Sequence, residues 1–324
     1  MRIPAVLVAC SLLLAGCLER KETITVQKDG TVEVSHVLKG DAGEFGADRV
    51  DALPSGAPWT VTDEDVARSD GSGSDHVRHA KATFARIEDV PQTNGAADDP
   101  APLRARTTLR IEAGKDGATR YVFERRYVPR AYAWRERIFR RTVPEDVLKA
   151  INENKEGPGH DQAVRRATEA LLAFEREKNQ ALLEEALGGG DTVTLLAARE
   201  KLGKSFDARW SVEGLLPFLQ GSAEERAALD RRFKDESASD AVAAGVAAGA
   251  GEAELKAAFV HERRKLEATE DLQDESFEVR VAFPVPVVLS DADSVEGNTA
   301  VFKFSGKDLC DSERVLRVVA EGKP

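Results

Sequence analysis

The spacing of apolar residues changes twice along the chain, and this change limits the folds that the chain can adopt. From Glu22 to about Val128, apolar and polar residues mostly alternate, which is typical of β-strands with one buried face. From Ala131 to about Leu272, apolar residues recur at three- and four-residue intervals, which indicates amphipathic helices. The alternation returns after Glu275. The sequence therefore predicts strands at both ends of the chain and helices between them.

Two hairpins are predicted in the first β part. Asp29-Gly30 and Asp116-Gly117 each lie between two alternating runs, and this arrangement is a strong hairpin signal. Further strands are expected at residues 76–87, 277–283, 300–304 and 314–319. Helices are expected at residues 164–187, 192–202, 223–233 and 252–270. The small-residue stretch from Ala241 to Gly251 fits either a mobile linker or a closely packed helix.

These patterns predict an α+β fold, in which an antiparallel β-sheet is built from N- and C-terminal segments with a helical insertion between them. The expected parts are a signal peptide at 1–16, an N-terminal β part at 17–129, a helical insertion at 130–272, and a C-terminal β part at 273–324 that completes the sheet. We expect the final strands to pair with the early ones, because the alternation resumes only after the helices.

The N-terminus has the organisation of an export signal. Arg2 supplies the positive charge, Ala5 to Leu14 form a short apolar run, and small residues lead to Cys17. Leu14-Ala15-Gly16-Cys17 resembles the lipobox of bacterial lipoproteins, at all four positions. The resemblance implies cleavage before Cys17, lipidation of Cys17 with acyl chains such as palmitate, and a lipid-anchored protein of the cell envelope. Leu18 stands where aspartate would mark inner-membrane retention, which favours the periplasmic side of the outer membrane in a cell with two membranes.

Charge and cysteine content narrow the expected partners. Loss of Arg2 with residues 1–16 leaves 45 of the 46 basic residues against 57 acidic ones, a formal charge of −12. This balance argues against nucleic acid and against a broad electrostatic hold on anionic lipid. Cys310 is the only other cysteine of the mature chain, so no intramolecular disulfide framework is expected.

One basic and aromatic segment departs from the acidic average. Residues 120–141 hold eight arginines against Glu124 and Glu136. Arginine beside aromatic rings binds carboxylates and phosphates and stacks on ring faces. The candidate partner-binding residues are Arg125, Arg126, Arg135, Arg137, Tyr127 and Trp134. The alternative is structural, with Tyr121 and Phe123 facing the core and the arginines paired with glutamates of the helices.

Other motif-like stretches lack a required residue. Ala198 stands where a phosphate-binding loop needs its first glycine, so the stretch to Ser205 is interpreted as a helix that ends at Gly203. His261 begins a zincin-like pattern, but Lys265 occupies the second histidine position. We therefore predict no catalytic residues, no metal site and no cofactor.

The β parts resemble LppM-like envelope lipoproteins in two places. These are the strand–turn–strand end from Ser290 to Phe304 and the hairpin at Lys28-Asp29-Gly30 that follows the lipobox. The resemblance covers about a sixth of the chain and implies no shared catalytic residues. We expect a non-catalytic, membrane-anchored binding or scaffolding module, with an acidic envelope protein or polymer as its partner. The alternatives are a cell-wall or glycan hydrolase that uses an acidic pair, and an extracytoplasmic carrier of a small ligand.

Overall fold

The structure is a computed structural model of the chain. It describes residues 18–41, 56–68, 73–94, 102–130, 133–153, 159–189, 191–219, 222–273 and 275–323. The described residues form two compact units. We call them the β unit, within 15–131 and 267–324, and the helical unit, within 132–266. The expected signal peptide and Cys17 lie outside the described residues.

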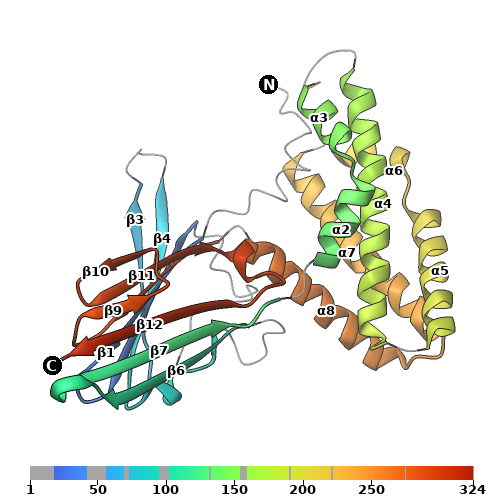
Figure 1. Cartoon of the computed structure of the whole chain (residues 1–324). Helices are drawn as coiled ribbons and strands as arrows, with labels where there is room; N and C mark the ends of the chain where they lie inside the picture. Colours follow the sequence, from blue (N-terminus) through green and yellow to red (C-terminus); the bar gives the residue numbers. More distant parts are fainter. Residues whose placement is uncertain are drawn as a thin grey trace. The chain divides into compact units, whose positions relative to one another are not determined.

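The larger sheet of the β unit has seven strands in the order β10-β11-β8-β1-β2-β4-β3. It joins blue strands from the start of the chain, such as β1, with red strands from its end, such as β11 (Figure 1). The seven strands are β1 (Glu19–Val26), β2 (Val32–Gly40), β3 (Thr60–Ala67), β4 (Ser74–Phe84), β8 (Ser276–Ala282), β10 (Ser294–Glu296) and β11 (Thr299–Ser305). β1 pairs antiparallel with β2 and parallel with β8. Strands from the two ends of the chain therefore share one sheet, and the predicted α+β fold is confirmed.

The smaller sheet has five strands in the order β5-β6-β7-β12-β9. They are β5 (Thr93–Asn94), β6 (Leu103–Ala113), β7 (Thr119–Tyr127), β9 (Val287–Ser290) and β12 (Arg314–Gly322). It also combines both ends of the chain, because β12 pairs with β7. The strands are divided between two sheets, whereas the sequence pattern suggested one. Each sheet has one apolar face, and the two faces bury each other.

Both predicted hairpins are present. Between β1 and β2, Gly30 has a φ of +87°, which favours glycine, and the Asp29 carboxylate accepts a hydrogen bond of 3.0 Å from the Thr31 amide. Between β6 and β7, Asp116 and Gly117 both have positive φ angles. These turns place β1 beside β2 and β6 beside β7, as the Asp-Gly pairs predicted.

The core of the β unit lies between the two sheets. Side chains of the larger sheet, such as Ile24 and Phe302, and of the smaller sheet, such as Phe123 and Val318, belong to one buried apolar cluster. The rings of Phe123 and Phe283 meet edge to face, 6.2 Å apart. The strands alternate between buried and exposed positions along most of their length, as a sheet with one buried face requires.

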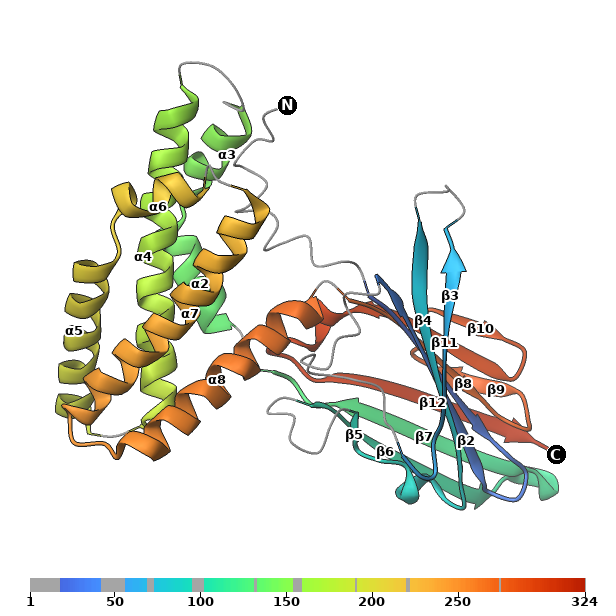
Figure 2. The ribbon, with the colours of Figure 1, turned by 180° about the vertical axis from the view of Figure 1, so that it is seen from behind.

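The helical unit contains α2 (Ala133–Thr142), α3 (Glu145–Glu153), α4 (His160–Ala186), α5 (Thr192–Arg209), α6 (Val212–Leu219) and α7 (Ala223–Val246). The final helix, α8 (Glu252–Gln273), starts in this unit and ends in the β unit (Figure 2). Asp191 caps α5 through hydrogen bonds from Val193 and Thr194, and Ser222 with Glu225 forms a capping box on α7. No helix among the described residues is long and apolar enough to cross a membrane.

Two details of the helical unit differ from or refine the sequence expectations. α5 does not end at Gly203 but continues to Arg209, because Gly203 is a buried helical residue packed against Arg176 and Gln180. Between Ala241 and Gly251, α7 is closely packed, since a Cβ added to Gly245 would lie 2.2 Å from a Leu255 methyl carbon. The packed-helix alternative is therefore confirmed over the part of this stretch that belongs to α7.

Candidate functional site

The basic and aromatic segment 120–141 does not form one surface. Its first part is β7, in the β unit, and its last part is α2, in the helical unit. On β7, inward positions alternate with outward ones, so Tyr121, Phe123, Arg125 and Tyr127 point into the core while Arg126 points out. Of the six predicted binding residues, Arg125 and Tyr127 contact each other, and the structure places both inside the β unit.

Arg125 is the centre of a buried polar cluster between the two sheets. Its side chain is 2% exposed. Its Nη2 donates to Glu22 Oε1 at 2.9 Å, its Nη1 to Thr107 Oγ1 at 2.6 Å, and its Nε to the Tyr127 hydroxyl at 3.1 Å. The guanidinium also lies 5.2 Å from the Tyr127 ring centre. Arg125 and Tyr127 were expected to bind a partner, and this expectation is corrected because both side chains are buried inside the β unit. The buried charge of Arg125 is stabilised by its internal hydrogen-bond partners.

Glu22 of β1 is the anionic partner and lies on the opposite sheet. Besides Arg125, it accepts a hydrogen bond of 3.1 Å from the Tyr127 hydroxyl. His36 lies across from Glu22 in the β1–β2 pair, with its Nε2 3.7 Å from Glu22 Oε1. That distance is too long for a hydrogen bond. The His36 ring packs instead against Trp59, with ring centres 5.3 Å apart.

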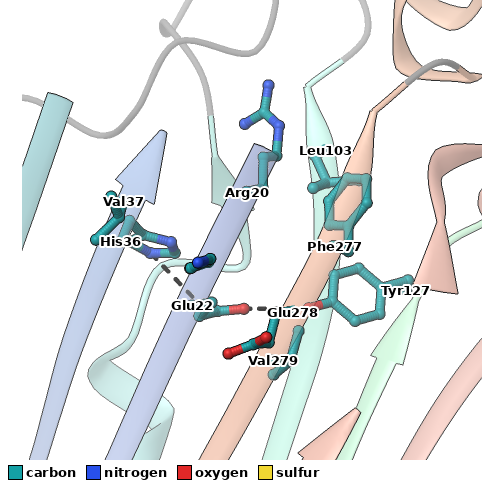
Figure 3. Close-up of a pocket in the computed structure, with 10 residues that line it drawn as sticks. Arg20, Glu22, His36, Val37, Leu103, Tyr127, Phe277, Glu278 and Val279 are labelled. Carbon is teal, nitrogen blue, oxygen red and sulfur yellow. Dashed lines mark hydrogen bonds and ion pairs between the residues drawn. The ribbon is translucent and has the colours of Figure 1, made fainter. Parts of the chain in front are cut away.

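A second buried pair lies at the same end of the β unit. Arg20 of β1 and Glu275, which follows α8, are both buried and form a two-contact ion pair. Arg20, Glu22 and His36 line a pocket with Tyr127 and Phe277 (Figure 3). Its cavity volume is about 20 Å³, which is room for about one water molecule. This pocket is far smaller than the roughly 300–1,000 Å³ of a typical small-molecule site.

Burial and charge change the acid–base behaviour of the cluster. Burial lowers the pKa of His36, and Arg125 and Arg20 lower it further, although Glu22 acts in the opposite direction. Burial also raises the pKa of the Tyr127 phenol, as does the neighbouring Glu22 carboxylate. Burial alone would lower the pKa of Arg125, but Glu22 and Tyr127 more than offset it, so this pKa is raised. His36 is therefore neutral and Arg125 charged near pH 7.

The geometry of the cluster suits a structural role. The Glu22 carboxylate is hydrogen-bonded to Arg125 and Tyr127, and the adjoining pocket has room for about one water molecule. Each of the two oxygens therefore accepts a hydrogen bond from within the β unit. Within the described residues, no group of three or more histidine, cysteine, aspartate or glutamate side chains could hold a metal ion.

The other four predicted binding residues lie outside this cluster. Arg126 is 41% exposed and pairs with Glu124 at 2.6 Å and Glu313 at 3.0 Å, both in the β unit. On α2, Trp134 is half-buried, and the Arg135 guanidinium lies 5.0 Å from the Phe174 ring centre. Arg137 is exposed and makes no ion pair with a residue that the structure describes. These residues remain candidates for partner contact.

Sequence reasoning missed the buried partners Arg20, Glu22, His36 and Glu275. The sequence does indicate that Arg20 and Glu22 point inward, because they occupy the same alternate positions of β1 as the apolar Ile24 and Val26. Charged residues at inward positions indicate either a strand end or a buried ion pair. Which strand supplies the opposite charge depends on the packing of the two sheets.

Comparisons with known proteins do not identify the chain. No family model matches it, and no curated protein matches it. Among solved structures, it is similar to the NMR structure of the folded domain of LppM from Mycobacterium tuberculosis. The identity is 10%, the TM-score is 0.34, and the alignment covers 95% of this chain and 92% of that chain. At this level the likeness is weak and gives no basis for assigning a function.

Proposed function

We propose that the chain is an acylated envelope lipoprotein whose folded part acts as a binding or scaffolding module directly at the membrane surface. The observation that carries this proposal is the position of Leu18. It follows Cys17, the cysteine of the lipobox-like Leu14-Ala15-Gly16-Cys17, and it already belongs to the core of the β unit.

Leu18 is held by its side chain and its backbone. The side chain is fully buried and packs against Leu38 and Ala80. Its carbonyl oxygen accepts a hydrogen bond of 2.9 Å from the Ser276 amide. Consecutive Cα atoms are about 3.8 Å apart. Acyl chains on Cys17 would therefore leave no flexible spacer between the bilayer and the folded unit.

Such a short tether favours partners that lie at the membrane surface over partners that lie far from the membrane. Two or three acyl chains hold a protein stably, since each buried methylene contributes about 0.8 kcal/mol. The partner that we propose is an acidic envelope protein or polymer, met through exposed arginines such as Arg126 and Arg137. In a cell with two membranes, Leu18 at the position after the cysteine favours the periplasmic side of the outer membrane.

Metabolic labelling tests the anchor. Cells that express the wild-type chain or Cys17→Ser are fed an alkyne fatty acid, fractionated and examined for label. We expect label and membrane association in the wild type and neither in Cys17→Ser. Equal labelling of the two chains would overturn the proposal.

Crosslinking in membranes tests the binding role. The wild type is compared with Arg126→Gln/Arg137→Gln, which keeps the buried Arg125 cluster intact, and recovered material is identified by mass spectrometry. We expect a specific envelope partner with the wild type and less of it with the variant. Equal recovery would exclude these two arginines as the contact.

A further inference from the structure

β3 is the longest of the strands that lie at a sheet edge in the β unit. The larger sheet ends at β10 and β3, and the smaller sheet ends at β5 and β9. β3 has eight residues, whereas β10, β5 and β9 have three, two and four. A short edge strand offers few backbone groups to another chain, and a long one offers many. Of these four strands, β3 is therefore best suited to pairing with a further strand.

One row of backbone groups on β3 faces away from β4. Directly after β3, the Arg68 amide donates a 2.9 Å hydrogen bond to the Gly73 carbonyl oxygen. Backbone groups of successive residues in antiparallel strands point to opposite sides, so those of Val61, Asp63 and Asp65 point to the outer side. β3 pairs only with β4 among the described strands, without a bulge. All eight of its residues are exposed, so this outer side is open to another chain.

The centre of β3 is acidic. Asp63, Glu64 and Asp65 are consecutive, and β3 contains no basic residue. Their side chains are 41%, 60% and 69% exposed. Arg78 pairs with Asp63, but the other two carboxylates have histidine partners, which are charged only when protonated. This edge therefore favours a strand that brings positive charge.

The same charges disfavour a second copy of β3 as the added strand. When two copies pair antiparallel over their full length, Asp63 of each lies opposite Glu64 of the other. A shift by one residue places Glu64 opposite itself and Asp63 opposite Asp65. Like charges directly opposite each other destabilise a sheet. The strand that fits this edge carries lysine or arginine instead.

We infer that β3 binds an extended basic segment of a partner protein, which adds to this edge as an antiparallel strand. Three consecutive lysine or arginine residues of the segment lie opposite Asp63, Glu64 and Asp65. Main-chain hydrogen bonds give such a contact its affinity, and the side chains give it specificity. The contact goes beyond the proposed function and shares no residue with Arg126 and Arg137, which meet an acidic partner.

A synthetic peptide tests the inference. A capped peptide of valine, threonine, three lysines, threonine and valine is added to the mature chain with Cys17→Ser. Amide hydrogen exchange is then followed by NMR at single residues. At saturating peptide, we expect exchange at Val61, Asp63 and Asp65 to slow by at least about fivefold. Unchanged exchange at these amides would overturn the inference.

The part of β6 beyond β5 provides a control edge in the same unit. The Ala105 amide bonds to the Gln92 carbonyl oxygen on the β5 side, so the amides of Thr107 and Leu109 point to that side as well. These residues lie past the end of the pairing with β5. Exposed arginines on β6 repel a basic peptide. We therefore expect no change of exchange at Thr107 and Leu109.

Two methylated peptides separate strand addition from simple charge attraction. In the expected register, the amides of the first and third lysines face β3, whereas those of the two threonines face away. N-methylation of these two lysines should abolish the protection, and N-methylation of the two threonines should preserve it. Equal protection by both peptides would exclude an added strand.

A pair of charge variants tests the acidic centre of β3. Glu64→Gln/Asp65→Asn keeps the backbone edge but removes two charges, and it should raise the Kd of the peptide at least about fivefold. Glu169→Gln/Glu213→Gln removes two carboxylates of similar exposure, 54% and 66%, from the helical unit, and it should leave the Kd unchanged. Equal Kd values for the two variants would show that the acidic residues do not select the segment. Protection of Asp63 and Asp65 that grows with protein concentration in the absence of peptide would point to a second copy as the occupant.

Discussion

Replacing Arg125 with methionine measures what the buried charge cluster contributes to the β unit. Arg125→Met keeps most of the side-chain volume but leaves Glu22 buried without its cation. Losing one partner of a buried ion pair costs about 3–5 kcal/mol. The neutral Tyr127 hydroxyl still donates to Glu22, so we expect a value near the lower end of that range.

The adjacent residue supplies a matched control. Arg126→Met removes an arginine from the next position of the same strand, but its side chain is 41% exposed and its ion pairs are at the surface. Exposed pairs contribute about 0–1 kcal/mol. We therefore expect Arg125→Met to lose about 2–3 kcal/mol more stability than Arg126→Met.

Urea unfolding followed by Trp59 fluorescence is a suitable assay, because Trp59 packs against His36 and Phe84 in the β unit. Trp134→Phe and Trp210→Phe remove the helical-unit signals, and the Trp210 Nε1 has no hydrogen-bond partner to lose among the described residues. With slopes of about 1–3 kcal/mol per M, the Arg125→Met midpoint should fall by about 2 M.

A double variant separates the charge effect from loss of packing. In Glu22→Met/Arg125→Met both charges are gone, so the double variant should be more stable than the sum of the single losses by at least about 1 kcal/mol. If Arg125→Met and Arg126→Met lose equal stability, or if the two single losses simply add, the reasoning about the buried pair is refuted.

Three further predictions concern single residues of the β unit. Because the pKa of His36 lies below its ordinary value of 6.5, the unfolded chain takes up the proton first. The free energy of unfolding should therefore fall as the pH drops below about 6.5, by at most about 1.4 kcal/mol per pH unit. The urea midpoint, measured at acid and neutral pH, should change less with pH in His36→Gln than in the wild type. An equal change with pH in the two chains would contradict this prediction. Gly306→Ala would place a Cβ 1.6 Å from the Leu272 carbonyl oxygen, whereas Gly297 has a φ of +63° and open space around it. Thermal melts should show that the free energy of unfolding falls by more than about 3 kcal/mol in Gly306→Ala and by about 1 kcal/mol in Gly297→Ala. The reverse order would be inconsistent with this packing. Burial raises the pKa of the Cys310 thiol to about 11, so alkylation near pH 8 should be at least about tenfold slower in the folded chain than in urea, and equal rates would show that the thiol is accessible.

Local patterns were enough to predict most of the architecture. The three strands predicted after α8, which are β8, β11 and β12, and the four longest helices are present where periodicity placed them. Their ends differ by a few residues for most of them and by more for α5 and α7. β3 was missed because all of its residues are exposed, so that it has no apolar alternation. α2 was missed because Ile138 is its one buried residue, so that it has no long apolar stripe. In both cases a neighbouring element, β4 or α4, supports the missed one.

The candidate site was harder to predict than the fold. Arginine is almost never fully buried unless it is paired, so composition alone suggested that Arg125 lies at the surface. Arg125 occupies the same alternate positions of β7 as Tyr121, Phe123 and Tyr127, which favoured a buried side chain. A buried cation, however, needs an anionic partner. That anion is Glu22, 103 residues away and on the other sheet. Such a long-range pair can be recognised only when the packing of the two sheets is known.

The parallel pairing of β1 with β8 has a consequence for the order in which the chain folds. The Arg20–Glu275 contact at this pairing joins residues 255 positions apart, and contacts between such distant residues form late. The helical unit is one continuous stretch of sequence within 132–266, so it can fold before β8 pairs with β1. Until then, one edge of β1 lacks its partner, next to the proposed anchor. The two sheets can therefore be completed only after β8, β11 and β12 have joined the strands of the N-terminal part.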